Sequence, residues 1–95
     1  MRVKDETIQF LKKSIREYLS DAAIYLIGSR ANDNLKGGDI DILVIGQKEL
    51  TGQEKRKIKL AFYKELGEQK VDIISLTKKD SSPFKELVLL DGVQI

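Results

Sequence analysis

The sequence has no cysteine and no histidine among its 95 residues. Without cysteine there is no disulfide framework and no thiolate metal site, and without histidine the commonest zinc ligand and general base is missing. Catalysis by a serine–histidine or cysteine–histidine pair is therefore excluded. Long apolar runs are also lacking, because no segment approaches the roughly 20 residues of a membrane span, and the polar first residues do not resemble a signal peptide. We expect a cytoplasmic protein without membrane segments.

The rest of the composition is typical of an ordinary globular protein. Hydrophobic residues make up 41% and charged residues 34% of the chain, which is enough apolar material for a modest core. The length fits a single domain over residues 1–95. Seventeen basic and fifteen acidic residues leave a net charge of +2, which is too small to indicate direct binding of nucleic acid.

Three helices are expected from hydrophobic spacing and capping residues. Apolar residues at intervals of three and four predict an amphipathic helix over 5–19. Thr51 and Glu54 have the spacing of a capping box, which predicts the start of a second helix that ends at Gly67. A third, short helix is expected over 82–92, where a serine N-cap precedes a proline at the first helical position.

Short apolar runs rich in β-branched residues predict the strands of the protein. They cover residues 22–27, 39–46 and 71–76. Residues 93–95 are expected to add an edge strand. The order of elements predicts an α/β (α+β) fold in which helices flank a small mixed β-sheet.

Two aspartates at the start of the second expected strand are the main candidates for chemistry. Because Asp39 and Asp41 stand two residues apart, their side chains point to one face of a strand, roughly 7 Å apart along the chain. Two carboxylates held beside an apolar strand repel each other, and a cation between them offsets that cost. All-oxygen ligation favours magnesium or manganese. The alternative is that Asp39 merely begins the strand and Asp41 faces water.

A third aspartate, Asp72, is the second residue of the next long strand. If that strand neighbours residues 39–46, Asp72 lies at the same end of the sheet as the first two aspartates, and three carboxylates converge. The alternative role of Asp72 is to offset the charge of Lys70. The hypothesis of a metal site therefore depends on the combination of the three.

The end of the first expected strand offers a candidate phosphate-binding turn. The lack of a side chain at Gly28 lets backbone N–H groups approach a phosphate, the Ser29 hydroxyl can donate to its oxygen, and Arg30 adds a positive charge. A glycine–serine pair alone is common in turns. Its place ahead of the paired aspartates makes it more informative.

Three segments together resemble a known family. Residues 28–31, 38–44 and 71–74 are similar to the GS…DxD…D pattern of the polymerase-β-like nucleotidyltransferases. More closely, the chain resembles the minimal nucleotidyltransferases, the MntA-type antitoxin subunits that are paired with HEPN-domain toxins, over about its whole length. The chain departs from that family at Asn32 and Asp33, where a basic residue and a glycine are frequent. A negative charge there is unfavourable near a triphosphate.

This resemblance implies the polymerase-β-like nucleotidyltransferase fold and a transfer of AMP from ATP to a hydroxyl group. Asp39, Asp41 and Asp72 would be the catalytic residues and would hold two Mg²⁺ ions, with Mn²⁺ as a possible substitute, and Asp72 would help to deprotonate the acceptor. Gly28, Ser29 and Arg30 would bind the phosphates of the nucleotide. The implied acceptor is a tyrosine of a partner HEPN toxin, whose RNase activity the transfer blocks.

Two other functions stay open from the sequence. The chain could be an antitoxin that masks its partner by contact alone, or it could transfer a nucleotide to a small molecule such as an aminoglycoside. The apolar residues Phe84, Leu87, Val88 and Leu90 are expected to fill the core, with a contact to the partner as the alternative. No segment offers an identifiable pocket for the nucleotide base.

Overall fold

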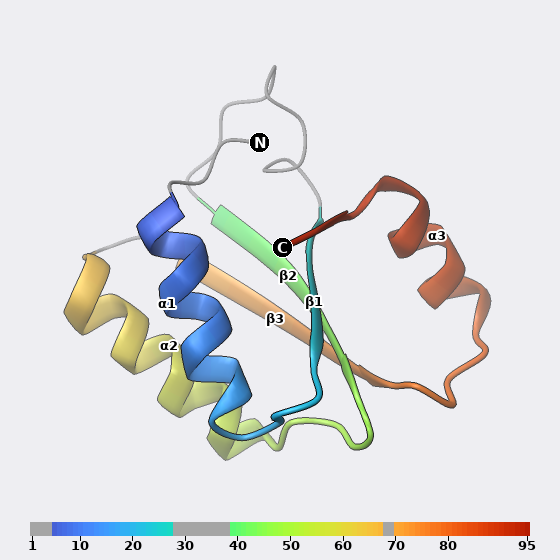
Figure 1. Cartoon of the computed structure of the whole chain (residues 1–95), viewed down its shortest axis with the longest axis horizontal. Helices are drawn as coiled ribbons and strands as arrows, with labels where there is room; N and C mark the ends of the chain where they lie inside the picture. Colours follow the sequence, from blue (N-terminus) through green and yellow to red (C-terminus); the bar gives the residue numbers. More distant parts are fainter. Residues whose placement is uncertain (1–4, 28–38, 68–69) are drawn as a thin grey trace.

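The computed structural model describes residues 5–27, 39–67 and 70–95. Within these ranges the chain forms three helices and four strands (Figure 1). In chain order they are α1 (Asp5–Arg16), β1 (Ala23–Ile27), β2 (Asp39–Gly46), α2 (Gly52–Leu66), β3 (Lys70–Thr77), α3 (Pro83–Asp91) and β4 (Val93–Gln94). The predicted mixed sheet with flanking helices is confirmed.

The four strands form one sheet in the order β3-β2-β1-β4. The long strands β2 and β3 run parallel, and α2 forms the crossover between them, whereas β1 is antiparallel to both β2 and β4. The condition that the sequence left open, that the strand carrying Asp72 neighbours the strand carrying Asp41, is met.

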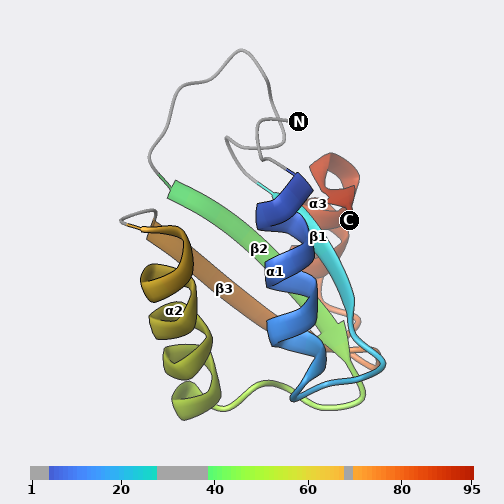
Figure 2. The same cartoon turned by 60° about the vertical axis from the view of Figure 1, so that its left-hand side comes forward.

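The helices cover both faces of the sheet unequally. Helices α1 and α2 lie together on one face, and the short α3 lies on the other (Figure 2). The larger core lies under α1 and α2 and includes Leu11, Ile15, Ile24, Leu26, Ile40, Ile42, Val44, Ile58, Phe62, Val71 and Ile73. On the α3 side a smaller cluster of Ile27, Leu43 and Ile45 packs against Val88 and Leu89.

The expected ends of α2 are confirmed in atomic detail. The Thr51 hydroxyl accepts a hydrogen bond from the Glu54 backbone N–H (3.0 Å), and the Glu54 carboxylate accepts one from the Thr51 N–H (2.9 Å). This reciprocal pair satisfies two backbone donors that a helix otherwise leaves free. Gly67 ends the helix at a φ of 91°, a conformation that favours glycine.

A buried hydrogen bond secures the connection from β2 to α2. The Leu50 backbone N–H donates to the Ser75 hydroxyl on β3 at 2.8 Å, and both residues are buried. Since Ser75 lies beside Val44 in the parallel pair, this bond ties the crossover to the two strands that carry the aspartates.

Two expectations need correction. Helix α1 ends at Arg16, not at residue 19; Leu19 is buried because the turn after the helix folds it against the sheet, where its side chain fills the space above Gly46. The core role expected for the apolar residues of α3 holds for Val88 alone, since Phe84, Leu87 and Leu90 are exposed.

In the described part of the chain no helix is long and apolar enough to cross a membrane.

Candidate active site

The parallel register of β2 and β3 places two of the predicted aspartates side by side. Asp41 is the direct partner of Asp72 across the two strands. Neighbouring strands lie about 4.8 Å apart, and residues paired in this way project to the same face of a sheet. Both residues are half-buried. The two carboxylates therefore form a pair on adjacent strands, as the three-carboxylate hypothesis requires.

The burial pattern identifies the face on which this pair lies. The residues on either side of Asp41, Ile40 and Ile42, belong to the core under α1 and α2, and so do Val71 and Ile73 beside Asp72. Because side chains alternate along a strand, the aspartates project to the opposite face, the one that α3 covers in part. Apolar residues hold the two strands in place from one side, and the carboxylates are presented on the other.

The pair lies at one end of the sheet. Ile27, the last residue of β1, is the partner of Asp41 on the other side of β2. A cross-strand row therefore runs from Asp72 through Asp41 to Ile27, and Gly92, which follows α3, packs closely against Ile27. The row thus joins the carboxylate pair to the C-terminal end of α3.

The remaining predicted residues are described only in part or not at all. Asp39 is the first residue of β2 and pairs in register with Lys70; its side chain lies outside the described part. Gly28, Ser29 and Arg30 lie outside the described residues, and so do Asn32 and Asp33. Among the residues that are described, no group of three or more acidic, histidine or cysteine side chains could hold a metal ion, so the described carboxylate site consists of Asp41 and Asp72.

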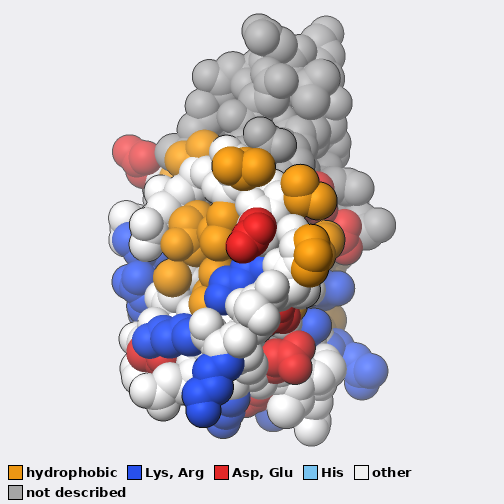
Figure 3. Space-filling view, turned by 90° about the vertical axis from the view of Figure 1, so that its right-hand side faces the viewer, with side chains coloured by type: hydrophobic (Ala, Val, Ile, Leu, Met, Phe, Trp, Pro, Cys, Tyr) orange, Lys and Arg blue, Asp and Glu red, His pale blue; other side chains and the backbone are white. Residues whose placement is uncertain are grey.

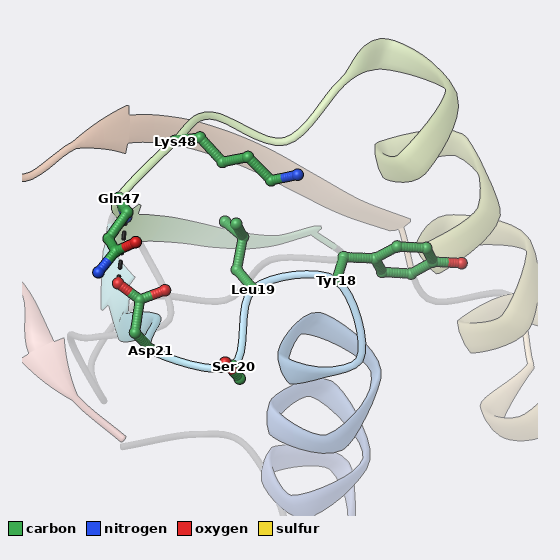
Figure 4. Close-up of a pocket in the computed structure, with 6 residues that line it drawn as sticks. All are labelled: Tyr18, Leu19, Ser20, Asp21, Gln47 and Lys48. Atoms are coloured by element: carbon green, nitrogen blue, oxygen red, sulfur yellow. Dashed lines mark hydrogen bonds between the residues drawn. The ribbon is translucent and has the colours of Figure 1, made fainter.

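The opposite end of the sheet has a hollow that the sequence did not predict. Its volume is about 370 Å³, and it is lined by Tyr18, Leu19, Ser20, Asp21, Gln47 and Lys48 (Figure 4). Asp21 accepts a hydrogen bond from the Gln47 backbone N–H and pairs with Lys78 at 3.1 Å. The hydrogen bond from Lys78 lowers the pKa of the Asp21 carboxyl below its ordinary value. These contacts join the turn after α1 to the ends of β2 and β3, which is a structural role.

Comparison with protein families decides which kind of protein carries this carboxylate pair. Residues 9–95 match the family model described as "Polymerase beta, Nucleotidyltransferase". The chain belongs to this nucleotidyltransferase family. A search among curated proteins gave no match.

Several solved structures similar to this chain are toxin–antitoxin structures. A crystal structure of a toxin–antitoxin with AMP-PNP has a TM-score of 0.71 and 23% identity, covering 97% of this chain and 72% of that chain. A variant of the toxin–antitoxin MntA-HpeT with two aspartates replaced by glutamate has a TM-score of 0.70 and 22% identity, covering 97% and 71%.

A third similar structure comes from Shewanella oneidensis and contains a tri-AMPylated HEPN toxin in complex with an MNT antitoxin. It has a TM-score of 0.60 and 24% identity, covering 93% of this chain and 70% of that chain. At these identities the likeness establishes the fold, and it agrees with the sheet order and helix layers described above.

Proposed function

We propose that this chain is a magnesium-dependent nucleotidyltransferase that moves AMP from ATP to a tyrosine hydroxyl of a partner HEPN toxin, and that it thereby acts as an antitoxin. The observation that carries the proposal is the pairing of Asp41 with Asp72 on the partly covered face of the sheet, in a chain of the nucleotidyltransferase family. The similar structures with AMP-PNP and with an AMPylated HEPN toxin support the choice of nucleotide and acceptor.

The donor chemistry of the pair fits a hard divalent cation. Both described side chains offer carboxylate oxygens, and the chain has no cysteine or histidine that would favour a softer metal. In our proposal Asp39, Asp41 and Asp72 hold two Mg²⁺ ions, for which Mn²⁺ can substitute. Bound ions of this kind stabilise the entering and departing oxygens of an in-line displacement at phosphorus.

The chain's own residues have separate tasks in the reaction. Asp72 takes the proton of the tyrosine hydroxyl, whose oxygen forms a new bond to the α-phosphorus of ATP. The bond from that phosphorus to the oxygen bridging the α- and β-phosphates breaks, and pyrophosphate leaves. Ser29, Arg30 and the backbone at Gly28 hold the β- and γ-phosphates so that the leaving group is in line with the attack.

We propose that the acceptor comes from another protein, because the described residues cover only part of the face that carries the pair. In the described part of the chain α3 is the only helix on that face, and it packs near β1. We expect the gene for the HEPN-domain acceptor to adjoin the gene for this chain, and both proteins to be in the cytoplasm. Residues 1–95 would act as one minimal nucleotidyltransferase domain.

Intact-mass spectrometry tests the transfer. The purified HEPN-domain partner is incubated with this chain, ATP and Mg²⁺, and we expect partner molecules that carry AMP. The adduct should disappear with Asp39→Ala or Asp72→Asn and in the presence of a chelator, while Glu49→Gln, at an exposed site away from the pair, should leave it unchanged. If the aspartate variants formed as much adduct as the wild type, the assignment of Asp39 and Asp72 as catalytic residues would be contradicted.

Masking of the partner by contact alone is a second candidate function, and the exposed apolar residues of α3 favour it. Under this hypothesis the aspartates have no part in neutralisation. Co-expression of the toxin with Asp39→Ala separates the two readings. If the variant protects cells as well as the wild type does, masking explains the activity; if protection is lost although the two proteins still bind, transfer explains it.

A further inference from the structure

Helix α3 is apolar on both of its sides. Val88 and Leu89 face the sheet and pack on the cluster that contains Ile27 and Leu43. Three other apolar residues, spaced three apart along the helix, are exposed to 50%, 65% and 78% of their surface: Phe84, Leu87 and Leu90. A surface helix is normally polar on its outer side, and a helix that is apolar all round is normally buried. The outer side of α3, here called the α3 ridge, therefore has the character of a surface that another molecule covers.

The α3 ridge leads toward the carboxylate pair. Leu90, its most exposed residue, comes two positions before Gly92, which packs against Ile27 at the end of the row shared with Asp41 and Asp72. Both the ridge and the pair lie on the face of the sheet opposite α1 and α2. In Figure 3 hydrophobic side chains gather in the upper and middle part of the described surface, and Lys and Arg lie mostly below them. The ridge and the aspartates therefore share one face of the sheet, and the row through Ile27 connects them.

Among the side chains that the structure describes, the charged ones beside the Leu90 end of the ridge are acidic. Glu86 is exposed and stands four residues before Leu90, on the same side of the helix, and Asp41 and Asp72 lie beyond the end of α3. Lys85, the lysine of α3, donates its ammonium protons to the carbonyl oxygens of residues 77, 78 and 80 at 2.9 to 3.3 Å. The ammonium group of Lys85 therefore points toward the loop that connects β3 to α3 and does not offset the charge of Glu86.

We propose that the α3 ridge is the docking surface for the acceptor protein, and that the acceptor meets it with an apolar surface rimmed by Lys or Arg. Apolar contacts with Phe84, Leu87 and Leu90 provide affinity, and basic groups of the partner complement Glu86. This inference rests on the proposed function for the identity of the partner as the acceptor. The acceptor protein must bring its hydroxyl group to Asp41 and Asp72. Because the ridge and the pair lie on the same face of the sheet, one protein can bind the ridge and present its hydroxyl group to the pair.

Calorimetric titration with the HEPN-domain partner tests the ridge. Leu87→Glu places a charge in the middle of it, and we expect the Kd for the partner to rise by about tenfold or more, as for a central residue of an interface. Leu60→Glu is the matched control, because Leu60 is an exposed leucine (53%) of α2, on the other side of the sheet. Both leucines are exposed, so both variants should keep the wild-type melting temperature. Equal affinities of the two variants would overturn the proposal.

A charge reversal tests the basic rim separately. Glu86→Lys should weaken partner binding, and the loss should shrink as the salt concentration rises, because ions screen exposed charges. Unchanged or tighter binding would overturn the assignment of a basic rim.

Transfer kinetics distinguish a failure of docking from a failure of the proposed reaction. With Leu87→Glu we expect a higher KM for the partner and an unchanged kcat, whereas Asp72→Asn should lose kcat and keep the Kd. Adduct formation with an unchanged KM in Leu87→Glu would refute docking and leave the reaction in place. If Leu87→Glu weakens binding of the partner but neither the wild type nor any variant forms an adduct, docking would be supported and the reaction refuted.

A second copy of this chain is the competing occupant of the ridge. Sedimentation velocity of the chain alone should give a monomer. A dimer that Leu87→Glu converts to a monomer while partner affinity stays unchanged would assign the ridge to self-association and overturn the proposal.

Discussion

Replacement of Asp72 by asparagine should stabilise the metal-free protein. Asp41 and Asp72 are partners on adjacent strands, so their backbones are one strand spacing, about 5 Å, apart and their side chains project to the same face. At that distance two like charges repel by about 0.8 kcal/mol in water and by about 3 kcal/mol at an effective dielectric constant of 20. Both residues are only half-buried, so we expect a gain of about 1 kcal/mol, which raises the Tm of a domain of this size by about 4–8 °C.

Thermal unfolding of matched variants in chelator and in Mg²⁺ checks this expectation. In chelator Asp72→Asn should melt above the wild type, whereas Glu49→Gln, which removes an equal charge from an exposed site, should melt with it. Mg²⁺ at ten times its Kd should stabilise the wild type by about 1.4 kcal/mol and should do little for Asp72→Asn. The reasoning would be refuted if Asp72→Asn melted below the wild type in chelator, or if Mg²⁺ raised the Tm of Asp72→Asn and of the wild type equally.

Two further predictions concern stability. Ser75→Ala leaves the buried Leu50 N–H without its 2.8 Å acceptor, which should lower the free energy of unfolding by about 1–3 kcal/mol in denaturant titrations. The control Ser81→Ala, at an exposed position, should leave the free energy of unfolding almost unchanged. Similar losses in the two variants would count against this role of the hydrogen bond. The hydrogen bonds from Ser82 hold the pKa of Asp80 below its ordinary value, so the stability from this contact is present above about pH 4 and is lost as the pH falls through the lowered pKa. Asp80→Asn should therefore show a flatter decline of Tm in that acid range, and parallel Tm curves would refute this linkage.

Local signals in the sequence were sufficient for most elements of the fold. The run of β-branched residues over 39–46 coincides with β2, and the capping box at Thr51 begins α2 where the spacing predicts it. The end of α1 was wrong because Tyr18 and Leu19 continue the hydrophobic spacing although they lie beyond Arg16. Hydrophobic spacing reports burial, and a turn that folds back on the sheet buries a residue as well as a helix does.

The site was predictable in part, for a related reason. The alternation of side chains along a strand is local, so the sequence could identify Asp41 and Asp72 as residues of one end of their strands, but the parallel pairing that brings them together depends on the whole sheet. The exposure of Phe84, Leu87 and Leu90 was missed because a nine-residue helix that is apolar on both sides has no periodic signal that separates inner from outer residues.

Calorimetric titration of AMP-PNP into the chain in the presence of Mn²⁺ asks whether the aspartates bind a metal–nucleotide complex. The wild type should bind with saturable heat, and Asp41→Asn should lose at least about tenfold in affinity, because one carboxylate of the pair no longer neutralises the cations. An absence of binding heat in the wild type, or equal affinity in Asp41→Asn, would contradict the assignment of this pair as the nucleotidyl-transfer site.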